Sequence, residues 1–321
     1  TPDYSSAASD VYKRQHETIL FLVVIVALVI LSIQAEQFAT IDNLLNQGRF
    51  LTEVSLVALI MTFVIVTGGI DLSVGSILGL SAIVLGVAWK KLGLPLPLAI
   101  LVALSVGTLA GLFNGIIITR FKVPPLIATL ATLALYRGLA EGISQARSIR
   151  GYPEWFFILG QGEFFGIPTQ LWIVAFFTLL TGFILTYTTW GRATYAIGAN
   201  ETAARFSGIA VDKTKLFIYA ASGFAASLAA IIFVSRVSTT RSDMGMGLEL
   251  DAITAVVLGG TSIFGGKGTI VGTFFGLILI QILKNGLSLA GVKSDGTYIA
   301  IGLVLILTLL ISNLFNRNSE G

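Results

Sequence analysis

The densest group of charged and amide side chains in this sequence lies between two long apolar runs. It occupies Thr189–Lys215 and comprises Arg192, Asn200, Glu201, Arg205, Asp212, Lys213 and Lys215. Cysteine is absent and His16 is the only histidine, so nucleophilic triads and zinc sites lack the residues that they need. The chemistry that remains is recognition through ion pairs and hydrogen bonds. We therefore expect no catalytic residue, no bound cofactor and no metal ligand in this chain, and we expect this segment to meet a partner outside the apolar phase.

The same segment carries the start and stop signals of a short helix. Asn200 is a favourable N-cap, Glu201 suits the positive end of a helix, and Gly208 is placed to end it. The result is about two turns, whereas an isolated helix needs roughly 12 to 15 residues to be even marginally stable in water. We therefore expect this helix to dock on a partner.

An apolar ridge would face that partner. Ala203 and Phe206, with Ile209 just beyond the helix, share one face, and Arg205 lies beside them. The alternative is an ordinary solvated loop between two membrane spans, because a short apolar stripe is weak evidence alone. Docking is favoured because the helix is capped and because nothing nearby in the sequence covers Phe206.

Carboxylates within or beside apolar runs form a second group of candidates. They are Glu53, Asp71, Glu249 and Asp251. An unpaired carboxylate facing lipid at the bilayer centre costs about 3 kcal/mol on insertion scales, so such residues are candidates for a function. The simpler interpretation of Asp71 is a helix cap, and that of Glu249 and Asp251 is a cap or a boundary charge. A proton relay would need several acids or histidines along one path, which the spans do not supply.

Composition places these residues in a membrane protein. Of 321 residues, 55% are apolar and 12% are charged, about half of the roughly 25% charged residues of a soluble domain. Apolar runs of about 20 residues recur, which is the length that a helix needs to cross the hydrocarbon core. The short alternating segments typical of a β-barrel do not occur. We predict an all-α polytopic protein in a lipid bilayer, and no basic cluster with interleaved aromatic residues indicates a nucleic-acid partner.

The apolar runs predict about ten transmembrane helices in a single domain, residues 16–321. The expected spans are Ile19–Ile33, Leu51–Thr67, a span from Asp71 or Ser73 through Trp89, a span from Pro95 or Pro97 to Arg120, Val123–Ala140, Leu171–Tyr187, Leu216–Val234, a broken or short span near 249–266, Thr269–Leu289 and Tyr298–Phe315. The segment 1–15 is polar, lacks an initiator Met and reads like a translated DNA-library adaptor. We expect it to be a non-native leader or sequencing artefact and exclude it from the fold.

Two glycine patterns indicate how the spans pack. Gly107, Gly111 and Gly115 recur every four residues, a spacing that lets two backbones approach closely. In the broken span, Ala252–Leu258 is too short to cross comfortably, and glycine pairs follow it at 259–260 and 265–266. Non-helical backbone at such depth is tolerated only where protein or a water-filled cavity covers it, so we expect this segment to line a path.

One apparent nucleotide-binding motif fails on its spacing. The segment TSIFGGKGT resembles a P-loop, but Thr261 stands where that motif needs Gly, and Gly268 follows Lys267 where it needs Ser or Thr. We expect no phosphate cradle here. Energy from ATP would have to come through another polypeptide.

Four long segments together resemble a known family. They are GGIDLSVGSILGLSA (68–82), NG (114–115) with VPPLIATLATLALYRGLA (123–140), GRATYAIGANETAARFSGI (191–209) and ELDAITAVVLGGTSIFGGKGTIVGT (249–273). They are similar, in the same order, to segments of the ribose-type permeases of bacterial ABC sugar importers. The similarity extends from about Phe21 to Leu314.

The resemblance implies a transport subunit rather than an enzyme. It implies that a monosaccharide, delivered by an extracytoplasmic sugar-binding protein, crosses the inner membrane through a permease dimer. A separate ATPase subunit would bind ATP and Mg²⁺ and supply the energy. The segment 189–215 would be a cytoplasmic coupling loop that docks in a groove of that ATPase.

The resemblance also assigns residues to the coupling loop. Those that match the motif are Gly191, Arg192, Gly198, Asn200, Glu201, Arg205 and Gly208. We expect Asn200 to cap the helix and Arg205 to meet an acidic groove. For the translocation path we expect Asp71, Asn114, Glu249, Asp251 and Thr261. The spans would rock between two states, opening first one side and then the other.

Several alternatives stay open. Broken helices near the midplane also fit a secondary transporter driven by an ion gradient, although the sequence shows no clear inverted repeat. A permease of the same type could carry another solute, such as a nucleoside. The loops 142–166 and 239–247 depart from close ribose permeases, so the sequence does not name the sugar, nor does it choose between a homodimer and a heterodimer. Lys and Arg are balanced between the two sides, so charge bias does not set the orientation.

Overall fold

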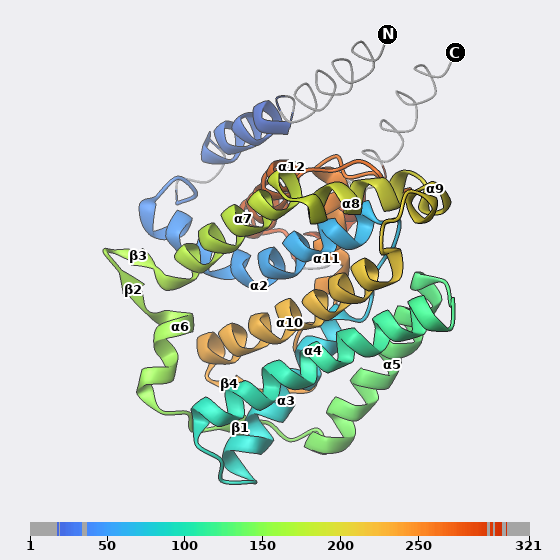
Figure 1. The fold of residues 1–321 in the computed structure, drawn as a ribbon. Coiled ribbons are helices and arrows are strands. Elements are labelled where there is room, and N and C mark those ends of the chain that lie inside the picture. The colour runs from blue at the N-terminus through green and yellow to red at the C-terminus, as the bar shows by residue number, and fades with distance from the viewer. Residues whose placement is uncertain are drawn as a thin grey trace.

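The computed structural model describes residues 18, 20–33, 37–293, 296–297, 299–303 and 306. Helices dominate these residues, together with two short antiparallel ladders (Figure 1). The elements from residue 37 onward are α2 (Ile41–Val66), α3 (Val74–Lys90), α4 (Leu96–Arg120), α5 (Pro125–Ser144), β1 (Ile149–Arg150), η1 (Glu154–Phe157), α6 (Ile158–Gln161), β2 (Glu163–Phe164), β3 (Ile167–Pro168), α7 (Thr169–Tyr187), α8 (Thr189–Ala199), α9 (Glu201–Phe206), α10 (Val211–Val237), β4 (Thr239–Thr240), α11 (Leu248–Leu258) and α12 (Ile270–Leu289). The prediction of an all-α protein is confirmed.

Six of the described helices are long and apolar enough to cross a membrane, namely α2, α4, α5, α7, α10 and α12. Two shorter apolar helices are Leu20–Ile33 and α3. The described part of the chain therefore supports a polytopic protein, but not the full predicted count of about ten spans. The leader expected at 1–15 and most of the last expected span, Tyr298–Phe315, lie outside the described residues.

α10 is the central helix of the molecule. It packs along α4, α2 and α3 and crosses the middle of the view in Figure 1. Its 27 residues give a length of about 40 Å at a rise of 1.5 Å per residue. Most of its buried positions carry small or hydroxyl side chains, such as Ser222, Gly223 and Ala226. Small side chains allow neighbouring helices to approach α10 closely on several sides.

The glycine row of α4 fits against α10. A Cβ on Gly111 would overlap the carbonyl oxygen of Tyr219, and one on Gly107 would overlap the side chain of Ser227. Gly223 faces the row from α10, and a Cβ there would overlap the carbonyl oxygen of Gly107. The predicted close approach of two backbones is confirmed, and the partner helix is α10.

α11 is the short helix predicted in the broken span. Its 11 residues give about 17 Å, little more than half of the roughly 30 Å hydrocarbon core. It runs antiparallel to α12, with Asp251 beside Lys284 and Gly259 beside Gly272. No helix continues between Gly259 and Thr269. The predicted break is confirmed.

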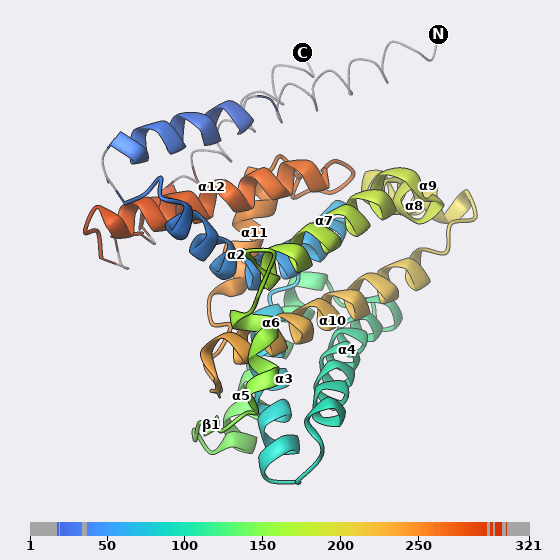
Figure 2. The same ribbon diagram turned by 90° about the vertical axis from the view of Figure 1, so that its left-hand side faces the viewer.

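The two ends of α10 lie beside different parts of the chain, as Figure 2 shows. Its first turn adjoins α8, α9 and the link between α4 and α5, which we call the coupling end. Its last turns adjoin α6 and the ladder between β1 and β4, which we call the distal end. In that ladder Ile149 pairs with Thr240, and Arg150 pairs with Thr239.

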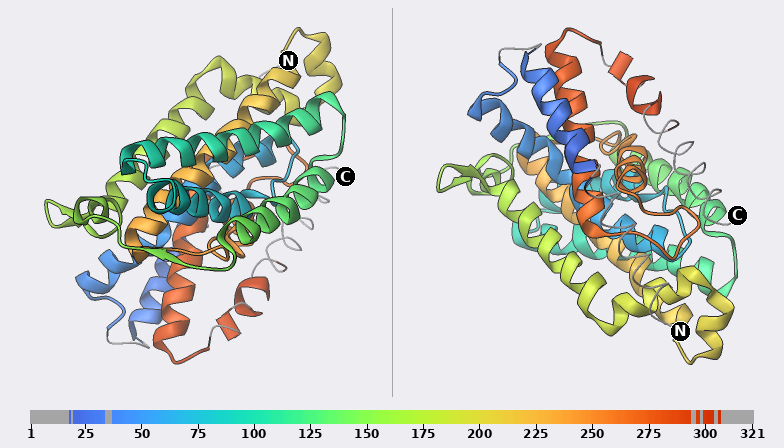
Figure 3. Two further views of the ribbon diagram at one scale, coloured as in Figure 1. Left: turned by 90° about the horizontal axis from the view of Figure 1, so that it is seen from below. Right: turned by 90° about the horizontal axis from the view of Figure 1, so that it is seen from above.

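Helix Leu20–Ile33 and α12 lie side by side on one flank of the molecule (Figure 3). The rings of Phe21 and Phe275 are 5.5 Å apart, and a Cβ on Gly286 would overlap the side chain of Leu31. The other face of Leu20–Ile33 carries exposed apolar side chains such as Val26. Such a surface suits contact with lipid.

Candidate functional site

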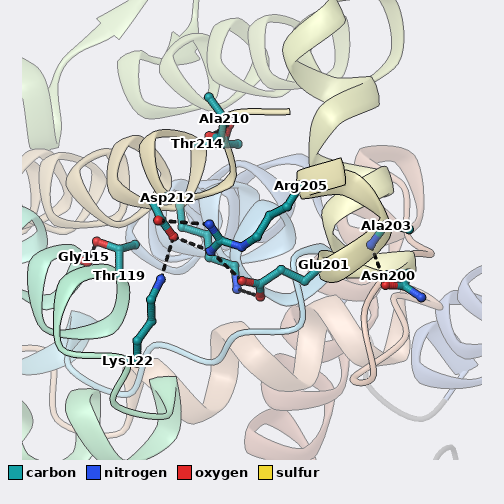
Figure 4. A network of polar contacts seen from close by, with 11 residues as sticks. Gly115, Thr119, Lys122, Asn200, Glu201, Ala203, Arg205, Ala210, Asp212 and Thr214 are labelled. Atoms are coloured by element: carbon teal, nitrogen blue, oxygen red, sulfur yellow. Dashed lines mark hydrogen bonds and ion pairs between the residues drawn. The ribbon is translucent and has the colours of Figure 1, made fainter. Parts of the chain in front are cut away.

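The coupling segment consists of two helices joined at Asn200. This residue ends α8 and begins α9, and its Oδ1 accepts a hydrogen bond from the backbone N–H of Ala203 at 2.9 Å (Figure 4). Gly208 follows α9 with φ of +82°, a left-handed conformation that side chains disfavour, and Ile209 N–H returns to the carbonyl of Ala204. The predicted cap and stop signal are both confirmed.

An ion-pair network ties α9 to the rest of the coupling end (Figure 4). Arg205 Nη2 lies 2.9 Å from Glu201 Oε1 and 2.5 Å from Asp212 Oδ1. Lys215 binds the other Glu201 oxygen at 2.6 Å, and Lys122 binds Asp212 at 3.1 Å. The network therefore connects α9, the first turns of α10 and the link between α4 and α5.

The network is held by charge-assisted hydrogen bonds in contact with solvent. Burial raises the pKa of Glu201, but hydrogen bonds from Lys215 and Arg205 outweigh it, so that its pKa lies below the usual value. Hydrogen bonds to Asp212 and Glu201 raise the pKa of Arg205 above its ordinary value. The side chains of Arg205 and Glu201 are 38% and 42% exposed, so each pair contributes only about 0–1 kcal/mol. Arg205, expected to meet an acidic groove on a partner, already binds acids of its own chain.

The apolar ridge of α9 is exposed. Phe206 is 89% exposed, and Ala203 is also exposed. Ile209 is half-buried and packs against a small cluster of Ile197, Ala204 and Val211. Phe206 thus presents its ring to the surroundings at the tip of the coupling end.

The end of α8 contacts the two breaks in the membrane helices through backbone. A Cβ on Gly198 would overlap the carbonyl oxygen of Val66, the last residue of α2. Gly266 N–H donates to that same carbonyl at 2.9 Å, and Tyr195 O–H donates to the carbonyl of Gly268 at 2.6 Å. Residue 198 must lack a side chain because three backbone segments meet there. We call this contact the glycine seam.

Two further residues of the coupling motif, Gly191 and Arg192, lie at the start of α8. Gly191 is buried at the start of α8, where a Cβ would overlap the carbonyl oxygen of Leu185. Arg192 is exposed, and its backbone N–H donates to Thr188. Gly191 therefore fixes the sharp turn from α7 into α8, and Arg192 faces outward.

A buried polar cluster surrounds Asp71 beneath the coupling end. Asp71 Oδ1 accepts hydrogen bonds from Ser73 N–H at 3.0 Å and from Ser73 Oγ at 2.7 Å. Its Oδ2 accepts from Ser222 Oγ of α10 at 2.8 Å. Asn114 of α4 donates to Ser73 Oγ at 2.7 Å. The structure thus brings together Asp71 and Asn114 from the expected path, and they meet through Ser73.

The Asp71 cluster relies on uncharged donors. Asp71, Ser73 and Asn114 have no exposed surface, and no described Lys or Arg forms an ion pair with Asp71. Tyr136 of α5 joins the cluster through Asn114, whose Oδ1 accepts from the Tyr136 hydroxyl at 3.4 Å, and that hydroxyl also donates to the carbonyl of Ala110 at 2.8 Å. Hydroxyl and amide groups compensate for part of the cost of burying a carboxyl group. The N-cap of α3 is Ser73 and not the expected Asp71, which lies two residues earlier and accepts a hydrogen bond from Ser73 N–H.

The other expected path residues lie elsewhere. Glu249 is half-buried in the first turn of α11 beside Gly75, and its Oε2 has no hydrogen-bond partner among the described residues. Asp251 binds Lys284 at 2.5 Å. Thr261 is buried in the irregular segment against Gly268. Asp71 and Asn114 therefore share one cluster, whereas Glu249, Asp251 and Thr261 lie apart from it, each with different neighbours.

Sequence reasoning did not single out several residues of these sites. Ser73, Ser222 and Tyr136 complete the Asp71 cluster, and Lys284 pairs with Asp251. The available signal was a hydroxyl or a charge inside an apolar run. Such a signal does not identify the partner, because Asp71 and Ser222 are 151 residues apart in the chain.

Six apolar helices of membrane-spanning length that enclose a buried polar cluster indicate a polytopic membrane protein. The chain belongs to the family described as branched-chain amino acid transport system / permease component, whose model matches residues 41–309. It is therefore a transport subunit of the inner membrane and not an enzyme, as predicted.

Individual relatives agree with this assignment. The chain is 40% identical to the ribose import permease protein RbsC of Haemophilus influenzae over 91% of this chain and 92% of that one. It is 42% identical to RbsC of Bacillus subtilis over 91% of each chain. It is also 40% identical to the autoinducer 2 import system permease protein LsrD of Escherichia coli, over 80% of this chain and 79% of that protein. No solved structure matches the chain significantly. The resemblance to ribose-type permeases is confirmed.

Proposed function

We propose that this chain is the membrane-spanning subunit of an ABC importer that carries a monosaccharide, ribose or a similar sugar, across the inner membrane. The names of two relatives at 40% and 42% identity support this cargo. An autoinducer 2 permease is also 40% identical, over 80% of this chain, so the solute stands as a proposal separate from the family. Residues 16–321 form one transmembrane domain of about ten helices. A second permease subunit, identical or related, completes the conduit.

The observation that carries the mechanism is the exposed tip of α9. Phe206 is 89% exposed on a helix that is capped at its start and ends at Gly208, and an aromatic side chain held in this way can anchor in a pocket on another protein. We infer that this partner is an ATPase subunit in the cytoplasm, which binds the ATP and Mg²⁺ that this chain does not bind itself. The distal end then faces an extracytoplasmic sugar-binding protein.

The coupling residues fall into two groups in this proposal. Phe206 enters the ATPase, while Arg205, Glu201 and Asn200 hold α9 on α10 in the orientation needed for docking. Gly191, Gly198 and Gly208 give the segment its turns and close contacts, and Arg192 adds an exposed charge. Arg205 is thus a positioning residue rather than a contact to an acidic groove.

The glycine seam provides a route from docking to transport. Movement of α8 would shift Val66 at the end of α2 and the irregular segment that holds Gly266 and Thr261. These segments adjoin the Asp71–Asn114 cluster and α11, which carries Glu249 and Asp251. The path opens to one side and then the other as these elements change position.

Co-purification with the ATPase tests this proposal. The permease is expressed with the ATPase and binding protein encoded beside it, and ATPase recovery is compared between wild type and Phe206→Asp. We expect Phe206→Asp to lose the ATPase, while Phe165→Asp, an equally exposed phenylalanine (84%) near the distal end, retains it. Sugar uptake into proteoliposomes without the ATPase would contradict the proposal and favour an ion-driven transporter. Uptake of a nucleoside in place of ribose would correct only the cargo.

A further inference from the structure

A cavity of about 420 Å³ lies at the distal end of the molecule. It is bounded by the first half of α2, the last turns of α10, the segment 239–248 and the start of α11. Among its lining residues are Phe50, Glu53, Phe233, Arg236 and Asp251. Asp212 at the coupling end and Arg236 both lie on α10, 24 residues apart, which is about 36 Å of helix. The cavity is therefore remote from the coupling segment.

Arg236 is held in one orientation at the wall of this cavity. Its Nε donates to Glu53 Oε1 at 2.9 Å, and the Glu53 side chain is only 4% exposed. Its guanidinium carbon lies 4.8 Å from the ring centre of Phe50 and 4.9 Å from that of Phe233. Its two terminal amino groups donate to no residue in the part of the chain that the structure describes. The guanidinium thus offers a fixed pair of free donors next to the cavity.

The charges around the cavity balance in pairs. The pairs are Glu53 with Arg236, Asp243 with Arg241, and Asp251 with Lys284. Such a balance gives no net attraction for an anion or a cation. Each carboxylate still has lone pairs to accept from a ligand hydroxyl, and Phe50 is 50% exposed for contact with apolar C–H groups. The cavity therefore offers the free N–H groups of Arg236 as donors, carboxylate oxygens as acceptors and the ring of Phe50 as an apolar face. These are the groups that bind a neutral polyhydroxylated molecule.

We propose that this cavity is a transit site for the vicinal diol of a pentose, free or as part of a nucleoside, on its way from the distal end into the path. Arg236 donates to the diol, Glu53 and Asp251 accept from it, and Phe50 packs on its C–H face. The inference rests on the proposed transport function and deepens it by naming a site. Because the polar groups are already paired with one another, the ligand gains little and is readily released, as transport requires.

The absence of cysteine from the sequence allows a direct test. A single Met246→Cys places a thiol at the exposed rim of the cavity, and Phe165→Cys serves as a control outside it. The complex with its ATPase is held in lipid nanodiscs, and the rate of thiol labelling is measured with D-ribose, with adenosine and with neither. We expect one of the two ligands to slow labelling at 246 about threefold when present at twice its Kd, and neither to change labelling at 165.

Variants separate a binding role of Arg236 from a structural one. Arg236→Lys keeps the positive charge beside Glu53 but removes the second free donor, so protection should need about a tenfold higher ligand concentration while ATPase recovery stays unchanged. Arg150→Lys, on β1 and exposed, should leave protection unaltered. The double variant Glu53→Gln with Arg236→Gln should abolish protection without leaving an unpaired buried charge.

The outcomes distinguish this site from the transport proposal itself. ATPase-dependent uptake without protection of residue 246 by either ligand would overturn the transit site and leave the proposed function standing. Protection by the binding protein alone, with no ligand present, would identify the cavity as a protein contact and would also overturn it. Uptake that needs no ATPase would instead refute the proposed function.

Discussion

Two carboxylate-centred regions of this permease are built on opposite principles. At the coupling end, Glu201 and Asp212 bind Arg205 and Lys215, and their side chains are 42% and 47% exposed. Beneath it, Asp71 is fully buried and, within the part of the chain that the structure describes, binds only hydroxyl and amide groups. Water and salt screen the first region, so its pairs are weak individually and can rearrange. In the second region no solvent replaces a lost partner, so every hydrogen bond matters.

The contrast assigns different tasks to the two regions. In the proposed mechanism the coupling end carries a helix that changes position, and a network of exposed ion pairs would let it move without a large penalty. The Asp71 cluster joins the start of α3 to α4 and α10, and it keeps these helices in register. The glycine seam at Gly198 links α8 to the end of α2 and to the irregular segment that holds Gly266. In the proposed mechanism it transmits displacement between the two regions.

The largest effect is expected from Asp71→Ala. The hydroxyls of Ser73 and Ser222 would lose their acceptor in a buried place, at about 1–3 kcal/mol for each unsatisfied group. We expect the free energy of unfolding to fall by about 2–4 kcal/mol, read as a lower thermal midpoint of the purified permease. The exposed acid Asp243, paired with Arg241, is the control, and its Ala variant should lose less than about 1 kcal/mol. Equal losses of unfolding free energy in Asp71→Ala and Asp243→Ala would show that burial of the Asp71 cluster does not make its hydrogen bonds more important.

The next effect is expected from Gly198→Ala. The added methyl group would overlap the carbonyl oxygen of Val66, and overpacking of this kind costs about 1–3 kcal/mol. Sugar uptake should fall strongly while the ATPase still co-purifies, because Phe206 remains exposed. Gly138→Ala in α5 is the matched control, since nothing lies within 4 Å of its added Cβ. Normal uptake by Gly198→Ala would show that the seam transmits nothing.

A smaller effect is expected from Asn200→Ala. Loss of the hydrogen bond to Ala203 N–H should destabilise α9 by about 1 kcal/mol, because a helix of this length depends on its cap. Hydrogen exchange at the amides of α9 should accelerate accordingly, while exchange in α10 stays unchanged. Asn200→Asp or Asn200→Ser should restore most of the protection. Faster hydrogen exchange in α10 as well would contradict a role of Asn200 that is limited to α9.

The smallest effect is expected from Glu201→Gln, and it depends on pH. The pKa of Glu201 is lowered in the fold, so its ionised form contributes stability above its unfolded pKa of about 4.3, and this contribution is lost as the pH falls through the lowered folded value. At pH 7 the variant should be less stable by at most about 1 kcal/mol. The thermal midpoints of variant and wild type should converge once the pH falls below the lowered folded pKa of Glu201, and also in 1 M salt. A difference that persisted under both conditions would point to a buried pair.

Local signals in the sequence predicted local structure well. Asn200 and Gly208 mark the ends of α9, and Gly107, Gly111 and Gly115 mark the face of α4 that meets another helix. The paired glycines after Leu258 mark the break in the short span. Each of these features depends on contacts within a few residues or on one helix face. Such features can be predicted from the spacing of residues in the sequence.

Tertiary pairing could not be predicted in the same way. The sequence did not reveal that Arg205 binds Asp212, seven residues further on, and its expected contact with a partner protein stays a prediction. Glu53 and Arg236 are 183 residues apart in the chain and pair across two helices. The sequence shows that such charges need partners inside an apolar bundle, but the choice of partner depends on how the helices pack.

Protection of residue 206 by the ATPase tests the central claim most directly, since Phe206→Cys gives the chain a single thiol at the tip of α9. The labelling rate of this thiol is compared in the permease alone and in its complex with the ATPase, with Phe165→Cys as the distal control. The account predicts that the ATPase strongly slows labelling at 206 and leaves labelling at 165 unchanged. Equal labelling at 206 in the presence and absence of a bound ATPase would show that α9 is not the point of contact.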